Sequence, residues 1–189
     1  MFRDRADAGR RLAEKLATYR HDAPVIIGLP RGGVAVAHAV ARALHAPLDV
    51  IVVRKLGTPD NPELGFGAIS EEDVVVFNQG VVRALGIDES DIDRAIARER
   101  LTLESRRAAL RSRHEQIDLK DRVVIVIDDG IATGIDARAA CRVVRARGAK
   151  EIVLAVPVAP ADWTTTMTRE ADRSEEHTSE LQSRETISY

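Results

Sequence analysis

The sequence predicts an α/β fold in which helices flank a doubly wound, mostly parallel sheet. Apolar runs rich in β-branched residues, typical of strands buried on both faces, occupy residues 24–29, 48–53, 123–127 and 151–158. Helical patterns separate these runs, and alternating strands and helices form parallel βαβ units. The 189 residues are enough for one such domain with a substantial core.

The first strand runs directly into a turn suited to an anion. Residues 24–29 are followed by Pro30-Arg31-Gly32-Gly33 and then by a predicted helix over residues 34–44. Glycines let backbone approach a ligand closely, and the free amides at the start of a helix attract negative charge. Arg31 adds a positive charge. By itself the signal is weak, because any tight turn accommodates two glycines. An amphipathic helix over residues 1–20 is expected before this strand.

The second predicted strand, residues 48–53, ends in Arg54 and Lys55. Two cations at the carboxyl end of a strand are costly to bury without an anion. They therefore either face solvent at the strand end or face a bound anion, and the residues alone leave both interpretations open.

A long excursion follows, from about residue 57 to residue 118. It starts with turn-forming residues, and residues 63–69, with two glycines, are expected to form a mobile or hinge segment. A short strand is expected at residues 74–77. A long helix is expected from Asp88 to His114, capped by Asp88 or Ser90 and carrying arginines and glutamates on a solvated face.

The most informative stretch is the strand at residues 123–127 together with the acid pair and loop beyond it. Asp128 and Asp129 stand where the strand must end, and a short loop then leads into a helix at residues 137–144. Ligands of open α/β sheets bind beyond the carboxyl ends of the strands. The loop suits a phosphate, whereas the two carboxylates suit hydroxyl groups or a phosphate-bound Mg²⁺. A sugar phosphate with free vicinal hydroxyls satisfies both.

This strand, acid pair and small-residue loop resemble the 5-phosphoribosyl-1-diphosphate (PRPP) motif of type I phosphoribosyltransferases. The resemblance implies that Asp128 and Asp129 hold the ribose 2′- and 3′-hydroxyls and that the following loop wraps the 5′-phosphate. The loop residues are Ile131, Ala132, Thr133, Gly134, Ile135 and Asp136. Family members usually carry Ser or Thr where Asp136 stands. A carboxylate there accepts hydrogen bonds but donates none, so it should weaken phosphate binding. Capping of the following helix and a sequence error are the alternative interpretations of Asp136.

The turn at Arg31, Gly32 and Gly33 resembles the diphosphate-binding loop of the same family, and Arg54 and Lys55 would then face the diphosphate. The implied reaction displaces diphosphate from C1 of Mg²⁺-bound PRPP by an unidentified nitrogenous base, or runs in the reverse, phosphorolysis-type direction. Asp128, Asp129 and Arg31 are the catalytic candidates. Mg²⁺ would arrive with PRPP, so no direct protein ligand for the metal is assigned. A non-catalytic module that senses PRPP is the alternative. The resemblance also nominates residues 57–69 as a lid.

The C-terminal part changes character after Pro160. Residues 164–189 are polar without a sustained period, which is typical of a disordered tail. Residues 173–183 resemble the in-frame translation of a sequencing adapter, so the predicted domain spans residues 1–172 and residues 173–189 are expected to be non-native. The sheet would then lack one strand and part of the family's hood over the base, and this copy would be inactive if those parts are needed.

Composition excludes several classes of protein. A net charge of −2 and 3% aromatic residues disfavour a nucleic-acid surface. The chain lacks a membrane-length apolar run, a signal-peptide pattern and the G-x-x-x-x-G-K-[ST] motif of nucleotide hydrolases. The single cysteine, Cys141, is expected to be buried and excludes an internal disulfide. We therefore expect a cytoplasmic protein that acts on small molecules and contacts neither nucleic acid nor membrane. A homodimer is one possible assembly.

Overall fold

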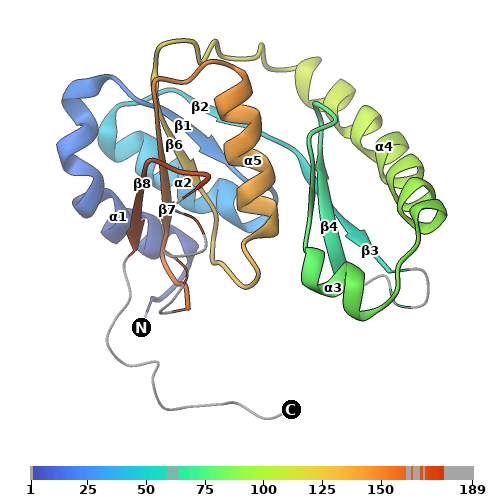
Figure 1. Cartoon of the computed structure of the whole chain (residues 1–189). Coiled ribbons are helices and arrows are strands. Elements are labelled where there is room, and N and C mark those ends of the chain that lie inside the picture. Colours follow the sequence, from blue (N-terminus) through green and yellow to red (C-terminus); the bar gives the residue numbers. More distant parts are fainter. Residues whose placement is uncertain are drawn as a thin grey trace.

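The computed structural model describes residues 2–58, 61, 64–160, 163, 167 and 169–176, and its core is a five-stranded parallel sheet (Figure 1). The strand order is β2-β1-β6-β7-β8, so the strand that precedes the acid pair lies at the centre. All five residues of that central strand are buried, as its apolar sequence requires. The strands are β1 (Val25–Gly28), β2 (Leu48–Val50), β6 (Val123–Ile127), β7 (Glu151–Val156) and β8 (Arg173–Glu176).

Helices cover both faces of this sheet, which confirms the predicted doubly wound fold class. On one face lie α1 (Arg5–Lys15), the 3₁₀ helix η1 (Leu16–Asp22) and α2 (Gly32–Leu44). On the other lies α5 (Ile135–Ala146), which contains the buried Cys141. Successive side chains of a strand point to opposite faces, so β6 supplies Ile125 to one apolar cluster and Val126 to the other.

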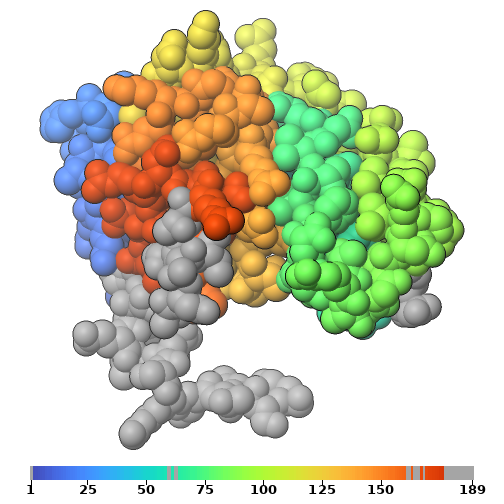
Figure 2. All heavy atoms as spheres, viewed as in Figure 1, coloured from blue at the N-terminus to red at the C-terminus, as the bar shows by residue number. Residues whose placement is uncertain are grey.

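A second, three-stranded antiparallel sheet stands beside the first and forms the inserted segment (Figure 1). Its strand order is β3-β4-β5, and two helices accompany it. The elements are β3 (Val53–Gly57), β4 (Gly65–Ser70), β5 (Val75–Phe77), α3 (Gln79–Ala84) and α4 (Glu89–Arg111). The predicted cap of the long helix is confirmed, because the Asp88 side chain accepts a hydrogen bond from the Asp91 amide. The second sheet packs directly against α5 (Figure 2).

Two predictions for residues 48–70 are wrong. The strand predicted at residues 48–53 ends at Val50, and Arg54 and Lys55 lie inside β3 of the second sheet rather than at a strand end of the first. Of residues 63–69, predicted to be a mobile or hinge segment, residues 65–69 belong to the central strand β4, which hydrogen-bonds to a neighbour on each side. Residues 59–60 and 62–63 of the expected lid lie outside the described residues.

The C-terminal segment contributes more to the fold than its sequence indicates. Arg173–Glu176, expected to belong to a tail, forms β8 in parallel register with β7. Glu176 accepts a 2.8 Å hydrogen bond from Trp163 Nε1 and a 3.2 Å hydrogen bond from the Ala159 amide. The described sheet therefore has a strand at this edge, contrary to expectation, whereas the adapter origin of the segment stays a prediction. Residues 177–189 lie outside the described part of the chain. Within that part, no helix is both long and apolar enough to cross a membrane.

Candidate functional site

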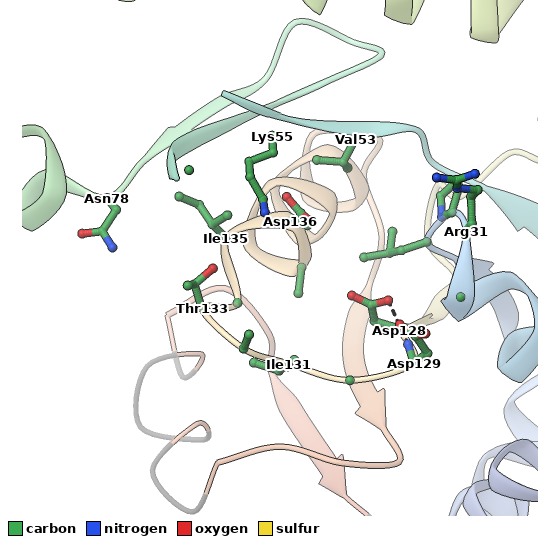
Figure 3. Close-up of a pocket in the computed structure, with 18 of the residues that line it drawn as sticks. Arg31, Val53, Lys55, Asn78, Asp128, Asp129, Ile131, Thr133, Ile135 and Asp136 are labelled. Atoms are coloured by element: carbon green, nitrogen blue, oxygen red, sulfur yellow. Dashed lines mark hydrogen bonds between the residues drawn. The ribbon is translucent and has the colours of Figure 1, made fainter. Parts of the chain in front are cut away.

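The turns that follow β1 and β6 lie side by side at the carboxyl edge of the main sheet. Gly28 and Ile127, the last residues of these strands, are paired across the sheet. Between this edge and the second sheet lies a pocket of about 470 Å³ (Figure 3). Segments distant in the sequence line it: Leu29–Gly32 after β1, Val53 and Lys55 of β3, Leu64 and Gly65, Asn78 and Val81, and Asp128–Ala137.

The acid pair occupies one end of this pocket. Asp128 Oδ1 accepts a 2.8 Å hydrogen bond from the Asp129 amide, which orients its carboxyl group. Asp129 Oδ2 forms an ion pair with Arg5 of α1, at 2.8 Å from Nη2. Burial raises the pKa of Asp128 to about 7, and the negative charges of Asp129 and Asp136 act in the same direction. The carboxyl group of Asp128 therefore ionises at a higher pH than that of an ordinary aspartate.

The glycines of the first turn allow it to approach the acid pair. A Cβ on Gly32 would lie 1.7 Å from Asp129 Oδ2, and a Cβ on Gly33 would lie 2.7 Å from the Ile127 carbonyl oxygen. Gly32 lines the pocket, whereas Gly33 packs behind it against β6. Helix α2 begins at Gly32, two residues earlier than predicted, and the preceding Pro30–Arg31 peptide bond is cis. The Arg31 side chain is exposed at the pocket rim.

The second turn runs from Ile131 to Asp136 and opens helix α5. Gly134 is the N-cap residue with φ of 68°, a conformation that favours glycine. Asp136 follows in the first helical turn and makes no cap bond, so the capping interpretation of this residue is wrong. Its Oδ1 atom is buried and has no hydrogen-bond partner among the described residues. Burial raises the pKa of Asp136, while the positive charges of Lys55 and Arg54 oppose that rise.

The adjacent cations Arg54 and Lys55 lie in different environments. Lys55 lines the pocket, and its side chain points toward Asp136 (Figure 3). Arg54 does not line the pocket and forms an ion pair with Glu99 of α4, at 2.9 Å from Nε to Oε2. Neighbouring residues of a strand point to opposite faces, so one strand presents a cation to each side. The expectation that both cations face one anion is therefore wrong.

The family of the chain follows from its similarity to known proteins. Residues 3–175 match the family model of the phosphoribosyl transferase domain. The chain belongs to the phosphoribosyltransferase family. A Mycobacterium tuberculosis relative named "Putative phosphoribosyl transferase Rv0571c" is 51% identical over 162 residues, which are 86% of this chain and 37% of that protein. The chain thus spans little more than a third of the curated relatives it matches.

Solved structures share the fold of this chain. The crystal structure of TT1426 from Thermus thermophilus has a TM-score of 0.77 and 40% identity, covering 97% of this chain and 87% of that one. A hypoxanthine phosphoribosyltransferase from Staphylococcus aureus has a TM-score of 0.50 at 11% identity, covering 92% and 72% of the two chains, and supports the fold alone. The type I phosphoribosyltransferase resemblance of the sequence is confirmed at the level of family and fold.

The pocket of this phosphoribosyltransferase-family chain also contains residues that sequence reasoning missed. Leu64, Asn78 and Val81 come from the inserted segment, and Arg5 reaches the acid pair from the first helix. Asn78 carried a local signal, since Asn is a frequent N-cap; its Oδ1 accepts from the Gly80 and Val81 amides and caps α3. Leu64 falls within the expected lid at residues 57–69 but was not named as a site residue, and nothing in the local sequence of Val81 or Arg5 connects them with the acid pair.

Proposed function

We propose that this chain binds Mg²⁺-PRPP in the pocket and transfers its phosphoribosyl group to a nitrogenous base, or catalyses the reverse reaction. The observation that supports the proposal is the convergence of three separate features on one pocket. The acid pair, the glycine turn after β1 and the small-residue loop before α5 all line it. A sugar that carries a phosphate at one position and a diphosphate at another requires these three kinds of group close together.

Each feature would have a separate role in binding. Asp128 and Asp129 would accept hydrogen bonds from the ribose 2′- and 3′-hydroxyls. In the loop from Ile131 to Asp136, the Ile131 amide donates to the Val158 carbonyl oxygen at 3.1 Å, and the amides that follow it, at the positive end of α5, would donate to the 5′-phosphate. The amides of Arg31 and Gly32 and the charge of the Arg31 side chain would hold the diphosphate.

The transfer step itself needs electrostatic stabilisation at two places. When the bond from C1 to diphosphate breaks, positive charge develops on the ribose and negative charge on the leaving group. The acid pair would offset the first, and Arg31 with the turn amides would offset the second. Bound Mg²⁺ would neutralise part of the diphosphate charge, and the carboxylate oxygens of the acid pair are of the type that this ion and its waters prefer.

Two measurements on the purified chain test the proposal. The first is PRPP binding by calorimetry in the presence of Mg²⁺, and the second is diphosphate release with a panel of purine and pyrimidine bases. Binding with diphosphate release supports a transferase. Binding without release for every base supports the PRPP-sensing alternative, and absence of PRPP binding contradicts both.

The acid pair is tested by the double variant Asp128→Asn and Asp129→Asn. Each hydrogen bond to a charged group contributes about 1.5–3 kcal/mol, so PRPP affinity should fall by at least about 100-fold. The matched control is the double variant Asp93→Asn and Glu104→Gln, which removes the same two charges from exposed positions on α4. Equal affinity of the acid-pair variant and the control would remove the sugar-holding role.

A further inference from the structure

The loop that we propose as the phosphate site carries a carboxylate, Asp136, whose hydrogen bonding is not satisfied by the described residues. Asp136 faces the pocket from the first turn of α5, and its buried Oδ1 has no hydrogen-bond partner in the described part of the chain. A buried acceptor without a partner costs about 1–3 kcal/mol, more if it is charged. A carboxylate in a loop proposed to hold a phosphate also repels that phosphate. Both costs point to a cation that acts at this position.

Lys55 is the cation placed to offset the negative charge of Asp136. It is directed across the pocket toward Asp136 from the facing sheet (Figure 3). Its path lies over Gly65 of the adjacent strand, where an added Cβ would come within 2.6 Å of Lys55 Cδ and 2.7 Å of Lys55 Cγ. Glycine at position 65 therefore leaves the space through which the lysine side chain enters the pocket.

The other charged groups near Asp136 are not placed to act as this cation on the pocket side. Arg54 also acts on Asp136 electrostatically but projects from the opposite face of β3 and is paired with Glu99. Asp128, from the end of β6, is itself acidic and repels Asp136. Arg138, on the same helix as Asp136, is paired with Glu170 at 3.4 Å. Arg31 also lines the pocket, but it belongs to the turn after β1 that is proposed to hold the diphosphate. Lys55 is left as the pocket cation that acts on Asp136.

We propose that Lys55 and Asp136 act as a coupled pair in the 5′-phosphate subsite, with Asp136 as a positioning residue that holds the Lys55 ammonium over the phosphate loop. Family members usually carry Ser or Thr at position 136. In this chain Lys55 supplies a positive charge, which such a hydroxyl does not have, and this charge offsets the repulsion between Asp136 and the phosphate. The pair rests on the proposed function, since it assumes that this loop binds a sugar phosphate. It also moves Lys55 from the diphosphate end of the ligand to the 5′-phosphate end.

A double-mutant cycle on the binding of ribose 5-phosphate, measured by calorimetry, tests the pair. Lys55→Met should weaken binding by about 10- to 100-fold, because a charge-assisted hydrogen bond is lost. Asp136→Asn alone should change affinity by less than about threefold, because relief of repulsion and loss of lysine positioning oppose each other. In the Lys55→Met background only the repulsion remains, so Asp136→Asn should restore about tenfold of the affinity.

Three controls separate this role from a structural one. Lys55→Arg, which keeps the charge, should bind within about threefold of the unmodified chain. Lys150→Met removes an exposed charge next to the start of β7, away from the pocket lining, and should leave the affinity unchanged. Thermal unfolding of each variant establishes that it is folded.

The outcomes distinguish this pair from the proposed function. Additive effects of the two substitutions, or unchanged affinity in Lys55→Met, overturn the pair while PRPP binding by the unmodified chain still supports the function. If the unmodified chain binds PRPP but not ribose 5-phosphate, the phosphate assignment of the loop and the pair are both overturned. If it binds neither, the proposed function is overturned as well.

Discussion

Arg5 and Asp129 are 124 positions apart in the sequence and form an ion pair in the structure, with Arg5 Nε 2.9 Å and Nη2 2.8 Å from the same carboxylate oxygen. The pair joins the start of the first helix to the end of the central strand. It also occupies one side of a carboxylate that we propose as a ribose ligand. A carboxylate has about four acceptor sites, so Asp129 can accept from Arg5 and from a hydroxyl at once.

We predict that Arg5→Met changes binding more than stability. The side chains are 62% and 34% exposed, and exposed pairs contribute at most about 1 kcal/mol, so the unfolding free energy in urea should fall by less than about 1 kcal/mol. Loss of the contact that orients Asp129 should weaken PRPP binding by about 3- to 10-fold in calorimetry. A stability loss above about 2 kcal/mol with unchanged PRPP affinity would show that the contact is structural instead.

The glycine turn should tolerate no side chain at position 33. In Gly33→Ala the new Cβ would meet backbone atoms, the Ile127 carbonyl oxygen at 2.7 Å and Asp128 Cα at 2.8 Å, so the helix must move away from the sheet. The gain in helix propensity, about 1 kcal/mol, should be outweighed, and we expect a net destabilisation of about 1–3 kcal/mol in urea unfolding. The matched variant Gly130→Ala, whose Cβ would meet its nearest atom at 3.5 Å, should stay within about 0.5 kcal/mol. Equal effects of the two variants would refute the close approach.

Asp128 should make folding stability depend on pH between about 4 and 7. Its pKa is raised by burial to about 7 in the folded chain, whereas in the unfolded chain it titrates near the ordinary value of an aspartate. Below that ordinary value both states are protonated and the full stability is present. As the pH rises, the unfolded chain ionises first, so stability is lost until the folded-state pKa is passed.

The comparison of the unmodified chain with Asp128→Asn isolates this effect, because the amide does not titrate. The unfolding free energy of the variant should rise relative to the unmodified chain by about 1–4 kcal/mol from about pH 4 to about pH 7.5, since one pKa unit corresponds to about 1.4 kcal/mol. Urea unfolding at several pH values measures the difference. A difference that is constant with pH would mean that Asp128 titrates normally.

We predict that loss of the Arg111 ion pairs destabilises the fold more than loss of an exposed ion pair on the same long helix. Its Nη1 lies 2.7 Å from Asp49 Oδ1 and its Nη2 lies 3.5 Å from Glu71 Oε1, and both carboxylates are buried. Arg111→Met leaves these charges without their cation, so we expect a destabilisation of about 3–5 kcal/mol. The control is Arg100→Met on the same helix, whose pair with Asp73 is 47% and 61% exposed and should contribute at most about 1 kcal/mol. Similar losses in urea unfolding would contradict this distinction.

The elements that could be predicted from the sequence are those whose signals are local. β6 is a run of five apolar β-branched residues, and its burial, the acids that follow it and the loop before α5 all occur where the pattern places them. The cap of α4 by Asp88 was likewise readable, because a cap bond joins residues three apart. β8 was missed since its sequence, Arg-Ser-Glu-Glu, has neither apolar character nor alternation, and pairing with β7 alone makes it a strand.

By itself the sequence determined the α/β class, the place of the acid pair at the end of a buried strand and the two turns beside it. These depend on residue type and spacing within a few positions, where backbone preferences and burial act directly. The tertiary structure alone decided that Arg54 leaves the pocket while Lys55 enters it, and that Arg5 reaches Asp129. The physical reason is that the side to which a strand residue points depends on which strands pair and in what register, and those contacts join residues far apart along the chain.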